Sequence, residues 1–563
     1  MVIAPKAYFL SHHCKHEQIR SQSADIWSLS LTISTTGICS RFFFFFSESL
    51  DLHSPSAEHC LQYPMKKSNK RRGQRKSSSV HLNADVLSII FHLNTLPDDS
   101  FTAGDEDYDV TSDRSLITAR FTSQVCRLWR YVMLSWPDIW ANSLNFKYLE
   151  QKNDNWRKEV LKRTGTAPLS IIARDLKNFH VGKVLFFSLL KNEAGRIRRI
   201  HTSTDGAAQG TSHESAWTSL FLQDAPKLEI VSFRLYHSIN ADLSNVVLFG
   251  NKQSKIHTFI LKGFRVFLPG PWNINIRHLE ILSGNIVRSL IPALTRMPQL
   301  ESLHLDECEI IPHTEQETKI RKPNIRHFHL NNSINAAAAI LDLIPPIIDG
   351  STSINIIDRI SVALLVEQVS RLNKGFILQM QVAFSKELSL YMTDFRMCLT
   401  NGLPIPAFAP IKPTFSISIN SYRALIHCLL LDSLSDSAAK TITHLDLSID
   451  VSESKSRNET LKTSLPRLLE SMHSVEVLHT TMNDIPFLTE RLHTPAVCFT
   501  RLHTLVLKPQ NRPISMALVH FIEKRRSVGF PLSRIEIKGS DRNIDKKALQ
   551  YLNGSGLIFE WAL

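Results

Sequence analysis

The nine residues Leu300-Glu301-Ser302-Leu303-His304-Leu305-Asp306-Glu307-Cys308 contain the pattern that decides the fold of this chain. An apolar residue is followed by two others, an apolar residue, one other and a third apolar residue. The alternation of Leu303 and Leu305 is typical of a strand with one buried side. Further copies, most of them roughly 20–33 residues apart, begin at Ile197, Leu228, Ile256, Ile276, Ile325, Ile357, Ile377, Ile442, Val475, Leu502 and Leu532.

This pattern resembles leucine-rich repeats of the irregular kind, which run about 20–29 residues and carry an L-x-x-L-x-L strand. The resemblance implies an α/β fold, in which parallel strands share one buried face and helical or irregular segments return from each strand to the next. Helical apolar spacing indicates such returns at Trp217–Gln223, Val287–Arg296 and Ala517–Lys524. In the family, an Asn or Cys after the third apolar position ties neighbouring turns through backbone hydrogen bonds, and Cys308 stands there. The alternative is an α/β domain without repeats.

The copies that begin at Ile357 and Ile377 (Ile357/Ile360/Val362 and Ile377/Met380/Val382) are weaker than the others. A longer gap then separates Ile377 from the next copy. Within that gap, Phe415–Ile419 alternates between apolar and polar residues, which predicts one more strand.

A second stretch, Val80–Asn142, has the spacing of helices. Asn83 suits the N-cap of the first helix, because its side-chain oxygen can accept a free amide hydrogen of the first turn. Pro137 ends the second helix, since the residue before a proline is driven out of the helical region. The apolar stripes are Leu82/Val86/Ile90 with Leu87/Phe91 in the first helix, and Phe121, Val125, Leu128, Trp129, Val132 and Trp136 in the second.

This stretch resembles the F-box-like segment common in fungal proteins. The most specific parts are Val125-Cys126-Arg127-Leu128-Trp129-Arg130 and Pro137-Asp138-Ile139-Trp140, which match the V-C-x-x-W-R and P-x-L-W elements of that family. The opening departs from the family at Asn83, where a proline is usual. The resemblance implies a small helical module that docks on the adaptor subunit of SCF-type cullin ubiquitin ligases.

Two groups of residues carry over from the family to this sequence. Those that would face the module core or the adaptor are Leu82, Val86, Leu87, Ile90, Phe91 and Val125. Those that would hold the module together are Cys126, Trp129 and Trp140. The alternative is that all nine belong to an ordinary helical core.

A chain of 563 residues is too long for one compact core, so we expect several parts. They are a disordered leader (1–79), the F-box-like module (80–142), a linking segment (143–165) and the repeat array (166–563). The acidic stretch Thr95–Ser115 inside the module predicts a mobile loop. In the linking segment, the spacing predicts a helix over Asn145–Thr164, which Gly165 would end. A strand is expected next, at Pro168–Ala173.

The net charge of +13 is largely local, because Lys66–Lys76 alone supplies seven positive charges. We therefore expect no nucleic-acid partner; the run is either a nuclear import signal or a solvated linker. Ile26–Phe46 is apolar, but Arg41 and several Ser and Thr residues argue against a membrane partner. Eight scattered cysteines fit a reducing compartment, so the protein is expected in the cytoplasm or nucleus.

The sequence contains no motif of a known catalytic, nucleotide-binding or metal site, so we expect no enzyme activity, no cofactor and no metal. Histidines recur on the strand motifs, where they would face outward on a concave surface. They are either polar surface or a partner contact that responds to pH. These histidines are His257, His278, His304, His327, His444 and His503.

These expectations combine into one hypothesis. The chain would be the substrate receptor of a cullin ubiquitin ligase, docking the adaptor through the F-box-like module and capturing a target protein on the repeat array. It would act by proximity, because holding a target beside the ligase raises its effective concentration. The alternative is a leucine-rich-repeat scaffold with no link to ubiquitin.

Overall fold

The structure of the chain is a computed structural model. All of the residues it describes belong to one compact unit, His81–Leu563. The predicted leader, Leu82 and residues 96–113 of the predicted acidic loop lie outside the described residues. Those described are 83–95, 114–150, 154–174, 180–204, 221–235, 241–243, 248–251, 255–266, 268, 270–282, 290–308, 325–341, 344–347, 350–357, 365–383, 387–393, 396–401, 415–420, 424–437, 439–450, 458–491, 498–508, 516–538, 550–551 and 556–562.

The described N-terminal part is helical. Helix α2 (Ala84–Thr95) begins after Asn83, whose Oδ1 accepts a hydrogen bond of 3.2 Å from the Asp85 amide. This bond satisfies an amide of the first turn, so the predicted N-cap is confirmed.

The single helix predicted for the second half of the F-box-like stretch is instead two helices, α3 (Ser115–Thr122) and α4 (Arg127–Ser135). Cys126 begins the new helix: its backbone is extended, and its Sγ accepts a hydrogen bond of 3.5 Å from the Trp129 amide. Pro137 ends α4 as predicted and also opens α5 (Pro137–Ala141), because a proline suits the first position of a helix.

The predicted linking helix is shorter than expected. Strand β1 (Leu144–Asn145) and a 3₁₀ turn, η2 (Phe146–Tyr148), come first, and helix α6 covers Asp154–Arg163. The Asn145 side chain accepts a hydrogen bond of 3.0 Å from the Lys147 amide, a local bond that competes with helix formation. Gly165 follows α6 with a left-handed φ of 49°.

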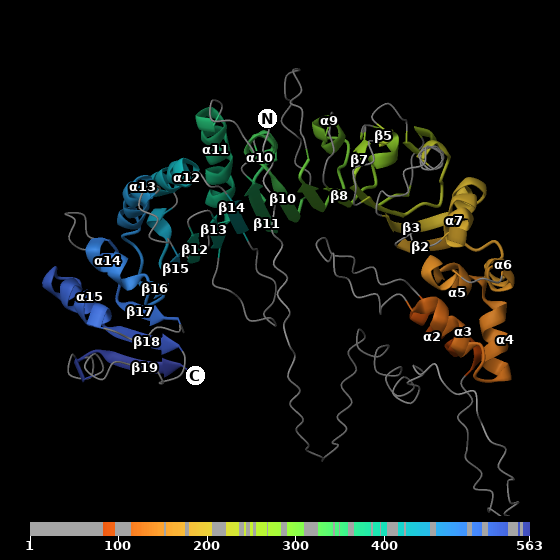
Figure 1. Cartoon of the computed structure of the whole chain (residues 1–563), viewed down its shortest axis with the longest axis horizontal. Coiled ribbons are helices and arrows are strands. Elements are labelled where there is room, and N and C mark those ends of the chain that lie inside the picture. Colours follow the sequence, from red (N-terminus) through yellow and green to blue (C-terminus); the bar gives the residue numbers. More distant parts are fainter. Residues whose placement is uncertain are drawn as a thin grey trace, which may run out of the picture. The chain divides into compact units, whose positions relative to one another are not determined.

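The first nine strands of the main sheet are all parallel, and each pairs with the next one along the chain (Figure 1). This is the architecture of a leucine-rich-repeat-like α/β solenoid, which confirms the predicted fold class. β5 (Ala241–Leu243) and β7 (Phe264–Val266) form a separate two-stranded sheet. The nine strands are β1, β2 (Leu169–Arg174), β3 (Ile197–Thr204), β4 (Ile230–Leu235), β6 (Thr258–Lys262), β8 (His278–Leu282), β9 (Ser302–Asp306), β10 (His327–Ser333) and β11 (Ser351–Ile357).

After β11 the spatial order of the strands reverses. β14 pairs in parallel with β11, β12 pairs in parallel with β15, and β13 lies between β14 and β12, antiparallel to both. The order across the sheet is therefore β11-β14-β13-β12-β15, and Phe415–Ile419 is a strand as predicted. The bounds of this insertion are β12 (Glu387–Thr393), β13 (Arg396–Asn401) and β14 (Phe415–Asn420), with α11 (Leu365–Ala383) before it and α12 (Ala424–Ser437) after it.

From β15 onward the parallel succession resumes, again with each strand beside the next. Four repeat motifs of the sequence, from Ile442 to Ile537, thus form strands where the pattern predicts them. These last strands are β15 (His444–Asp450), β16 (Val477–Thr480), β17 (Thr504–Leu507), β18 (Arg534–Lys538) and β19 (Ile558–Ala562).

Of the two weak copies of the repeat motif, one was predicted wrongly. Ile357 is the last residue of the strand β11, and Ile360 and Val362 of the first copy lie outside the described residues. Ile377/Met380/Val382 lie within the helix α11. In α11, the buried residues Val369, Leu372 and Phe376 recur every three or four positions, so the helical period prevails over the strand motif.

Helices lie along one side of the strands (Figure 1). The returns predicted at Val287–Arg296 and Ala517–Lys524 are the helices α9 and α15, whereas Trp217–Gln223 lies mostly outside the described residues. Besides α11 and α12, the helices of this layer are α7 (His180–Asn192), α9 (Leu290–Leu294), α10 (Ile334–Leu341), α13 (Asn458–Ser471), α14 (Ile485–Arg491) and α15 (Met516–Ser527). Short 3₁₀ turns are η4 (Ala194–Arg196), η5 (Leu248–Asn251), η6 (Pro271–Asn273) and η8 (Ala439–Thr441).

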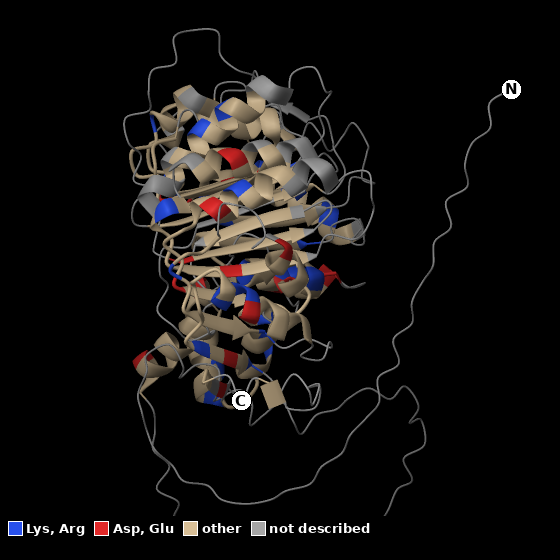
Figure 2. Ribbon diagram, turned by 90° about the vertical axis from the view of Figure 1, so that its left-hand side faces the viewer, with Lys and Arg blue, Asp and Glu red and all other residues tan. Residues whose placement is uncertain are grey.

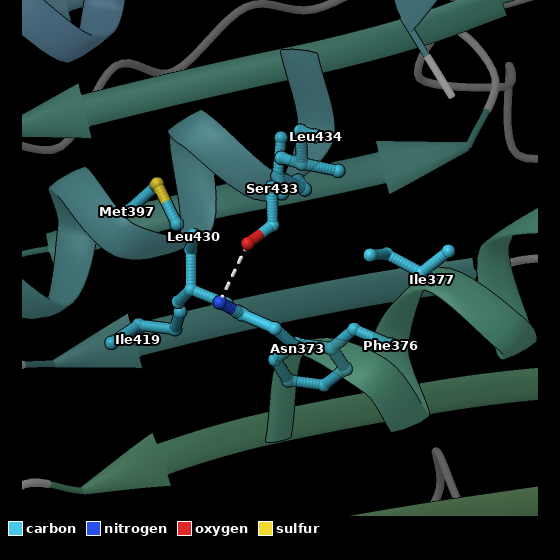
Figure 3. A pocket seen from close by; sticks show the side chains of 9 residues that line it. Asn373, Phe376, Ile377, Met397, Ile419, Leu430, Ser433 and Leu434 are labelled. Carbon is cyan, nitrogen blue, oxygen red and sulfur yellow. Dashed lines mark hydrogen bonds between the residues drawn. The ribbon is translucent and has the colours of Figure 1, made fainter. Parts of the chain in front are cut away.

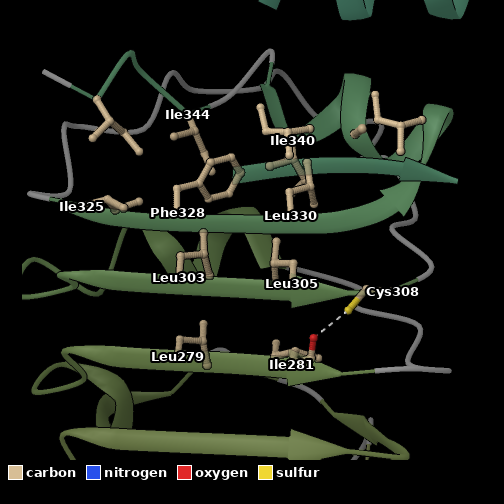
Figure 4. Close-up of a cluster of buried hydrophobic side chains, with 14 of the residues drawn as sticks. Leu279, Ile281, Leu303, Leu305, Cys308, Ile325, Phe328, Leu330, Ile340 and Ile344 are labelled. Carbon is tan, nitrogen blue, oxygen red and sulfur yellow. Dashed lines mark hydrogen bonds between the residues drawn. The ribbon is translucent and has the colours of Figure 1, made fainter. Parts of the chain in front are cut away.

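The core lies between the strands and these helices. In Figure 4, the second and third apolar residues of successive motifs, such as Leu303 and Leu305, stack above one another and are fully buried. Cys308 is buried beside them, and its Sγ donates a hydrogen bond of 3.2 Å to the carbonyl oxygen of Ile281 on β8. This bond joins two turns through the backbone, as the resemblance implies for that position.

Candidate functional site

The helical module has a buried and an exposed apolar side. Inside, the ring of Phe91 meets that of Trp129 edge on, with centroids 5.0 Å apart. The Trp140 ring is fully buried, and its Nε1 donates a hydrogen bond of 2.7 Å to the carbonyl oxygen of Met133. Trp140 also meets Trp156 of α6 edge on at 6.2 Å. These contacts fasten α2, α4, α5 and α6 together.

The exposed side carries an unusual number of large apolar residues, which we call the module surface. On α2 they are spaced three and four apart, so they share one face of the helix. α2 packs against both α3 and α4, which places the exposed residues on neighbouring helices. The module surface comprises Val86, Ile89, Ile90 and Leu93 of α2, Phe121 and Val125 at and after the end of α3, and Leu128, Tyr131, Leu134 and Trp136 of α4 and its end.

The predicted site residues divide between these two sides. Val86, Ile90 and Val125 belong to the module surface, with exposed fractions of 43%, 38% and 61%. Leu87 and Phe91 are buried, at 2% and 4%, so they belong to the core part of the prediction. The sequence places these α2 residues in one group, but the structure divides them between a buried and an exposed side of the helix.

The three residues predicted to hold the module together also differ. Trp140 is buried, and Trp129 is partly buried against Phe91. Cys126 is exposed, so it does not lie in the core. It acts instead through its N-cap bond to Trp129, and a sulfur at a helix start can accept that bond without being buried.

Several residues of the module surface were not among the predicted site residues, although Leu128 belongs to the apolar stripe predicted for the second helix. Ile89 and Leu93 continue the α2 stripe, while Leu128, Tyr131 and Leu134 form a stripe on α4. The sequence feature that could have identified them is that α4 has apolar residues on two sides. One side, with Val132 and Met133, is buried, and the other, with Leu128, Tyr131 and Leu134, is exposed.

The second candidate surface is the strand face, which is the side of the main sheet turned away from the buried leucines. Register places one side chain of each strand in a continuous central row. Polar and charged residues dominate that row. From β2 to β11 it reads Ile172, His201, Ser232, Ile260, Glu280, His304, His329 and Ser353.

A charged group lies at the middle of this row. The Arg234 guanidinium is 3.2 Å from a carboxylate oxygen of Glu280, and burial raises the pKa of Glu280. Nδ1 of His304 is 3.9 Å from Glu280, too far for a hydrogen bond. Burial lowers the pKa of His304 to about 3, helped by the neighbouring His329 and Arg234, so His304 is neutral near pH 7. Its ring meets that of His329 edge on at 4.2 Å.

The next row contains a ladder of amide side chains. Asn355 donates a hydrogen bond of 2.7 Å to the side-chain oxygen of Asn331, and Asn331 in turn donates to the carboxylate of Asp306. Each of the three residues comes from a different neighbouring strand, so the ladder fixes the polar groups of β9, β10 and β11 relative to one another.

The predicted row of histidines is found in part. His304 lies in the central row, whereas His278, His327 and His444 are the first residues of β8, β10 and β15. His257 and His503 come one residue before their strands and contact the hydroxyl groups of Thr258 and Thr504, at 3.0 and 2.8 Å. Burial lowers the pKa of both His257 and His278. A pH response of partner contacts through these histidines stays a prediction.

Two hollows among the described residues differ in size. The hollow of Figure 3, between α11, α12 and the strands β13 and β14, has a volume of about 10 Å³, room for about one water. Asn373 donates a hydrogen bond of 2.7 Å to Ser433 across it. In a larger hollow of about 230 Å³ near α3 and α6, Arg120 stacks over Trp156 at 5.1 Å. Glu150 there accepts the Gly182 amide at 2.6 Å.

Within the described ranges, no three His, Cys, Asp or Glu side chains are grouped as metal ligands would be. No helix of these ranges is both long and apolar enough to cross a membrane. Comparison of the chain with protein-family models and with curated protein sequences finds no match.

Proposed function

We propose that this protein is a substrate receptor of an SCF-type cullin ubiquitin ligase. In this proposal the adaptor subunit binds the module surface, and a target protein binds the strand face. The observation that carries the proposal is the module surface itself, which gathers apolar side chains of three short helices on the outside of a well-packed module. Contiguous exposed apolar residues are typical of binding surfaces, since a free monomer gains nothing from exposing them.

The choice of partner rests on the F-box-like resemblance. Val125, inside the V-C-x-x-W-R element, is 61% exposed, and Trp129 of the same element packs on Phe91. One element thus supplies both a residue for docking and a residue for the core. This division supports a module that is folded before it binds, because its core is complete without a partner.

The strand face supports the second half of the proposal. Its side chains come from successive strands of one sheet, and hydrogen bonds such as that between Asn331 and Asn355 hold them in place. A preorganised polar face binds a partner at a smaller entropic cost than mobile side chains would. The chain would then work by proximity, holding its target beside the ligase.

The test is to measure adaptor binding by full-length variants in which one exposed apolar residue becomes charged. Ile90→Asp places an unpaired charge in the proposed interface, and we expect it to cost about 2 kcal/mol or more, roughly thirty-fold in affinity. The matched control is Val184→Asp on α7, which is also exposed, at 73%, but lies outside the module. Equal binding by both variants would contradict docking through the module surface.

A further inference from the structure

The hollow of about 230 Å³ lies where the helical module meets the first turns of the repeat array, and we call it the junction pocket. Pockets for drug-sized ligands measure about 300–1,000 Å³, so a ligand of the junction pocket is smaller than these. The module surface and the rows of the strand face do not include its lining residues. These come from α3, from η2 and the residues just after it, and from α6, and they are Leu116, Ile117, Arg120, Lys147, Tyr148, Glu150 and Trp156.

The walls of the junction pocket are held by contacts outside it. Trp156 meets the buried ring of Trp140 edge on, with centroids 6.2 Å apart. The Arg163 guanidinium lies over both rings, at 4.5 Å from the centroid of Trp140 and 6.0 Å from that of Trp156. Nε of Arg163 in turn donates a hydrogen bond of 2.9 Å to Glu159. Leu116 is 1% exposed and thus fixed in the module core. These walls are therefore in place before a ligand arrives, which lowers the entropic cost of binding.

The lining contains two cations and one carboxylate. Within the described ranges, neither Arg120 nor Lys147 takes part in an ion pair. The carboxylate belongs to Glu150, and both of its oxygens are engaged by the start of α7. Oε1 accepts a hydrogen bond of 3.3 Å from the Val181 amide, and Oε2 accepts one of 2.6 Å from the Gly182 amide. The two cations of the junction pocket thus remain for an anion from outside the chain.

The position of Arg120 suits a planar anion. Its guanidinium carbon lies 5.1 Å from the centroid of the Trp156 ring, a cation–π contact that holds the group at the wall of the pocket. A guanidinium directs its N–H groups outward in its own plane, so a contact through its face leaves these donors for an acceptor. Two of them match the two oxygens of a carboxylate. Lys147 has a flexible stem and supplies a second positive charge to the same pocket.

We propose that the junction pocket binds a small organic anion that consists of one carboxylate on an aromatic body. The carboxylate pairs with Arg120 and Lys147. The body packs on the rings of Tyr148 and Trp156 and on the aliphatic side chains that α3 contributes. A free small acid and the last residue of a peptide both present this chemistry. The inference depends neither on adaptor docking nor on capture of a target by the strand face.

Two other anions compete for a pair of cations. A nucleic acid needs a basic track that continues along the surface. Basic and acidic residues are instead mixed over the ribbon seen in Figure 2. A phosphate ion would use Arg120 and Lys147 but leave the apolar lining, such as Trp156 and Ile117, in contact with water. An anion with an aromatic body uses both parts of the lining, which favours it over either competitor.

The experiment titrates benzoate against the full chain and follows binding by ligand-observed NMR. Benzamide has nearly the same shape without the charge, acetate has the charge without the ring, and inorganic phosphate is the third comparison. We expect benzoate to bind with a dissociation constant on the order of 1 mM or below, as suits about nine heavy atoms. It should bind at least about ten-fold more tightly than each comparison compound. Equal binding of benzoate and benzamide, or tighter binding of acetate or phosphate, would overturn the proposal.

A pair of peptides distinguishes the two sources of the carboxylate. Both are short and end in phenylalanine, one with a free carboxylate and the other with an amide. Tighter binding of the free carboxylate would show that the pocket accepts the end of a peptide chain. Binding of benzoate but of neither peptide would restrict the pocket to free acids. Both results agree with the proposal, whereas an absence of binding by benzoate and by both peptides would refute it.

Two single variants, Arg120→Gln and Lys147→Gln, test the residues themselves. Each should weaken benzoate binding by about ten-fold and so remove most of its advantage over benzamide. The matched control is Lys162→Gln, an exposed cation of α6 outside the pocket lining, which should leave both unchanged. Melting temperatures show whether each variant is folded, and having two variants protects against one that is not. Unchanged benzoate binding by both folded variants would contradict the proposal. Adaptor binding is measured on the same samples, so failure of docking and failure of the pocket are distinguished.

Discussion

The ring of Phe91 on α2 lies edge to face with the ring of Trp129 on α4, with centroids 5.0 Å apart. Directly beside it on α2, Ile90 is 38% exposed. Neighbouring residues of one helix thus lie on different sides of it, because Phe91 joins the module's helices whereas Ile90 is exposed, and we propose that Ile90 contacts a partner. Mutations can therefore separate residues that hold the fold together from residues that would bind.

Replacing Phe91 should destabilise the fold. Phe91→Ala removes a buried ring and its contact with Trp129, which typically costs about 3 kcal/mol or more. The measurement is the free energy of unfolding of the full chain in urea, with Ile90→Ala as the control. If Ile90→Ala costs as much as Phe91→Ala, the division of α2 into a core side and a binding side is wrong.

The buried thiol of Cys308 should react slowly with alkylating reagents, and replacing Cys308 should lower the stability of the fold. Burial raises the pKa of Cys308 well above its usual range, and its Sγ bonds to Ile281. Native protein treated with an alkylating reagent should be modified at the exposed Cys126 far faster than at Cys308, as read by peptide mass spectrometry. Cys308→Ala should also lower stability by about 1 kcal/mol. Equal labelling of both thiols would contradict the buried position.

Asp484 should join neighbouring repeats, as Cys308 does, and its replacement should destabilise the fold more. It is 1% exposed, and its carboxylate accepts hydrogen bonds from the amide of Ile449 on β15, at 3.0 Å, and from Thr480 and Thr481. Asp484→Ala leaves these donors without a partner and should cost about 2–3 kcal/mol. Asp484→Asn keeps an oxygen acceptor and should cost less. Equal losses for Ala and Asn would mean that the hydrogen bonds contribute little.

Acid should destabilise the solenoid through its buried histidines. Burial is the main cause that lowers the pKa of both His201 and His304 to about 3. Below pH 6.5 the unfolded chain therefore binds a proton on each, whereas the folded chain does not, so stability is present above this pH and lost as pH falls. Below pH 6.5, each of the two histidines lowers the free energy of unfolding by about 1.4 kcal/mol for every pH unit by which the pH falls. Urea unfolding between about pH 7 and pH 5 should show a shallower slope for His304→Gln than for the unmutated chain. An unchanged slope would show that His304 is not held neutral.

Much of the solenoid could be predicted because its signal is local. Leu303 and Leu305 are two residues apart, and that alternation alone defines a strand with a buried side. The region around Ile377 was predicted wrongly, because the spacing of its apolar residues fits both the strand motif and the period of a helix. The order β11-β14-β13-β12-β15 could not be predicted, because strand pairing depends on contacts between segments far apart in sequence.

The candidate surfaces were harder to predict from the sequence than the strands were. The apolar stripe of α2 contains both Phe91 and Ile90, and only the packing of α4 on α2 decides which one is buried. Asp484 was missed because it comes four residues after the third motif position, not three. The polar row that contains Arg174 and Lys262 was missed for a different reason: these two residues are 88 positions apart in sequence numbering and share a row only through the register of four strands.

The central claim is that the module surface docks on a cullin-ligase adaptor, and its most direct test is a calorimetric titration of the unmutated full chain with the purified adaptor. Our account predicts saturable binding with one adaptor per chain and a negative heat-capacity change, since apolar side chains such as Ile90 and Val125 leave water on binding. An absence of binding at micromolar concentrations would contradict the ubiquitin-ligase function and favour a leucine-rich-repeat scaffold.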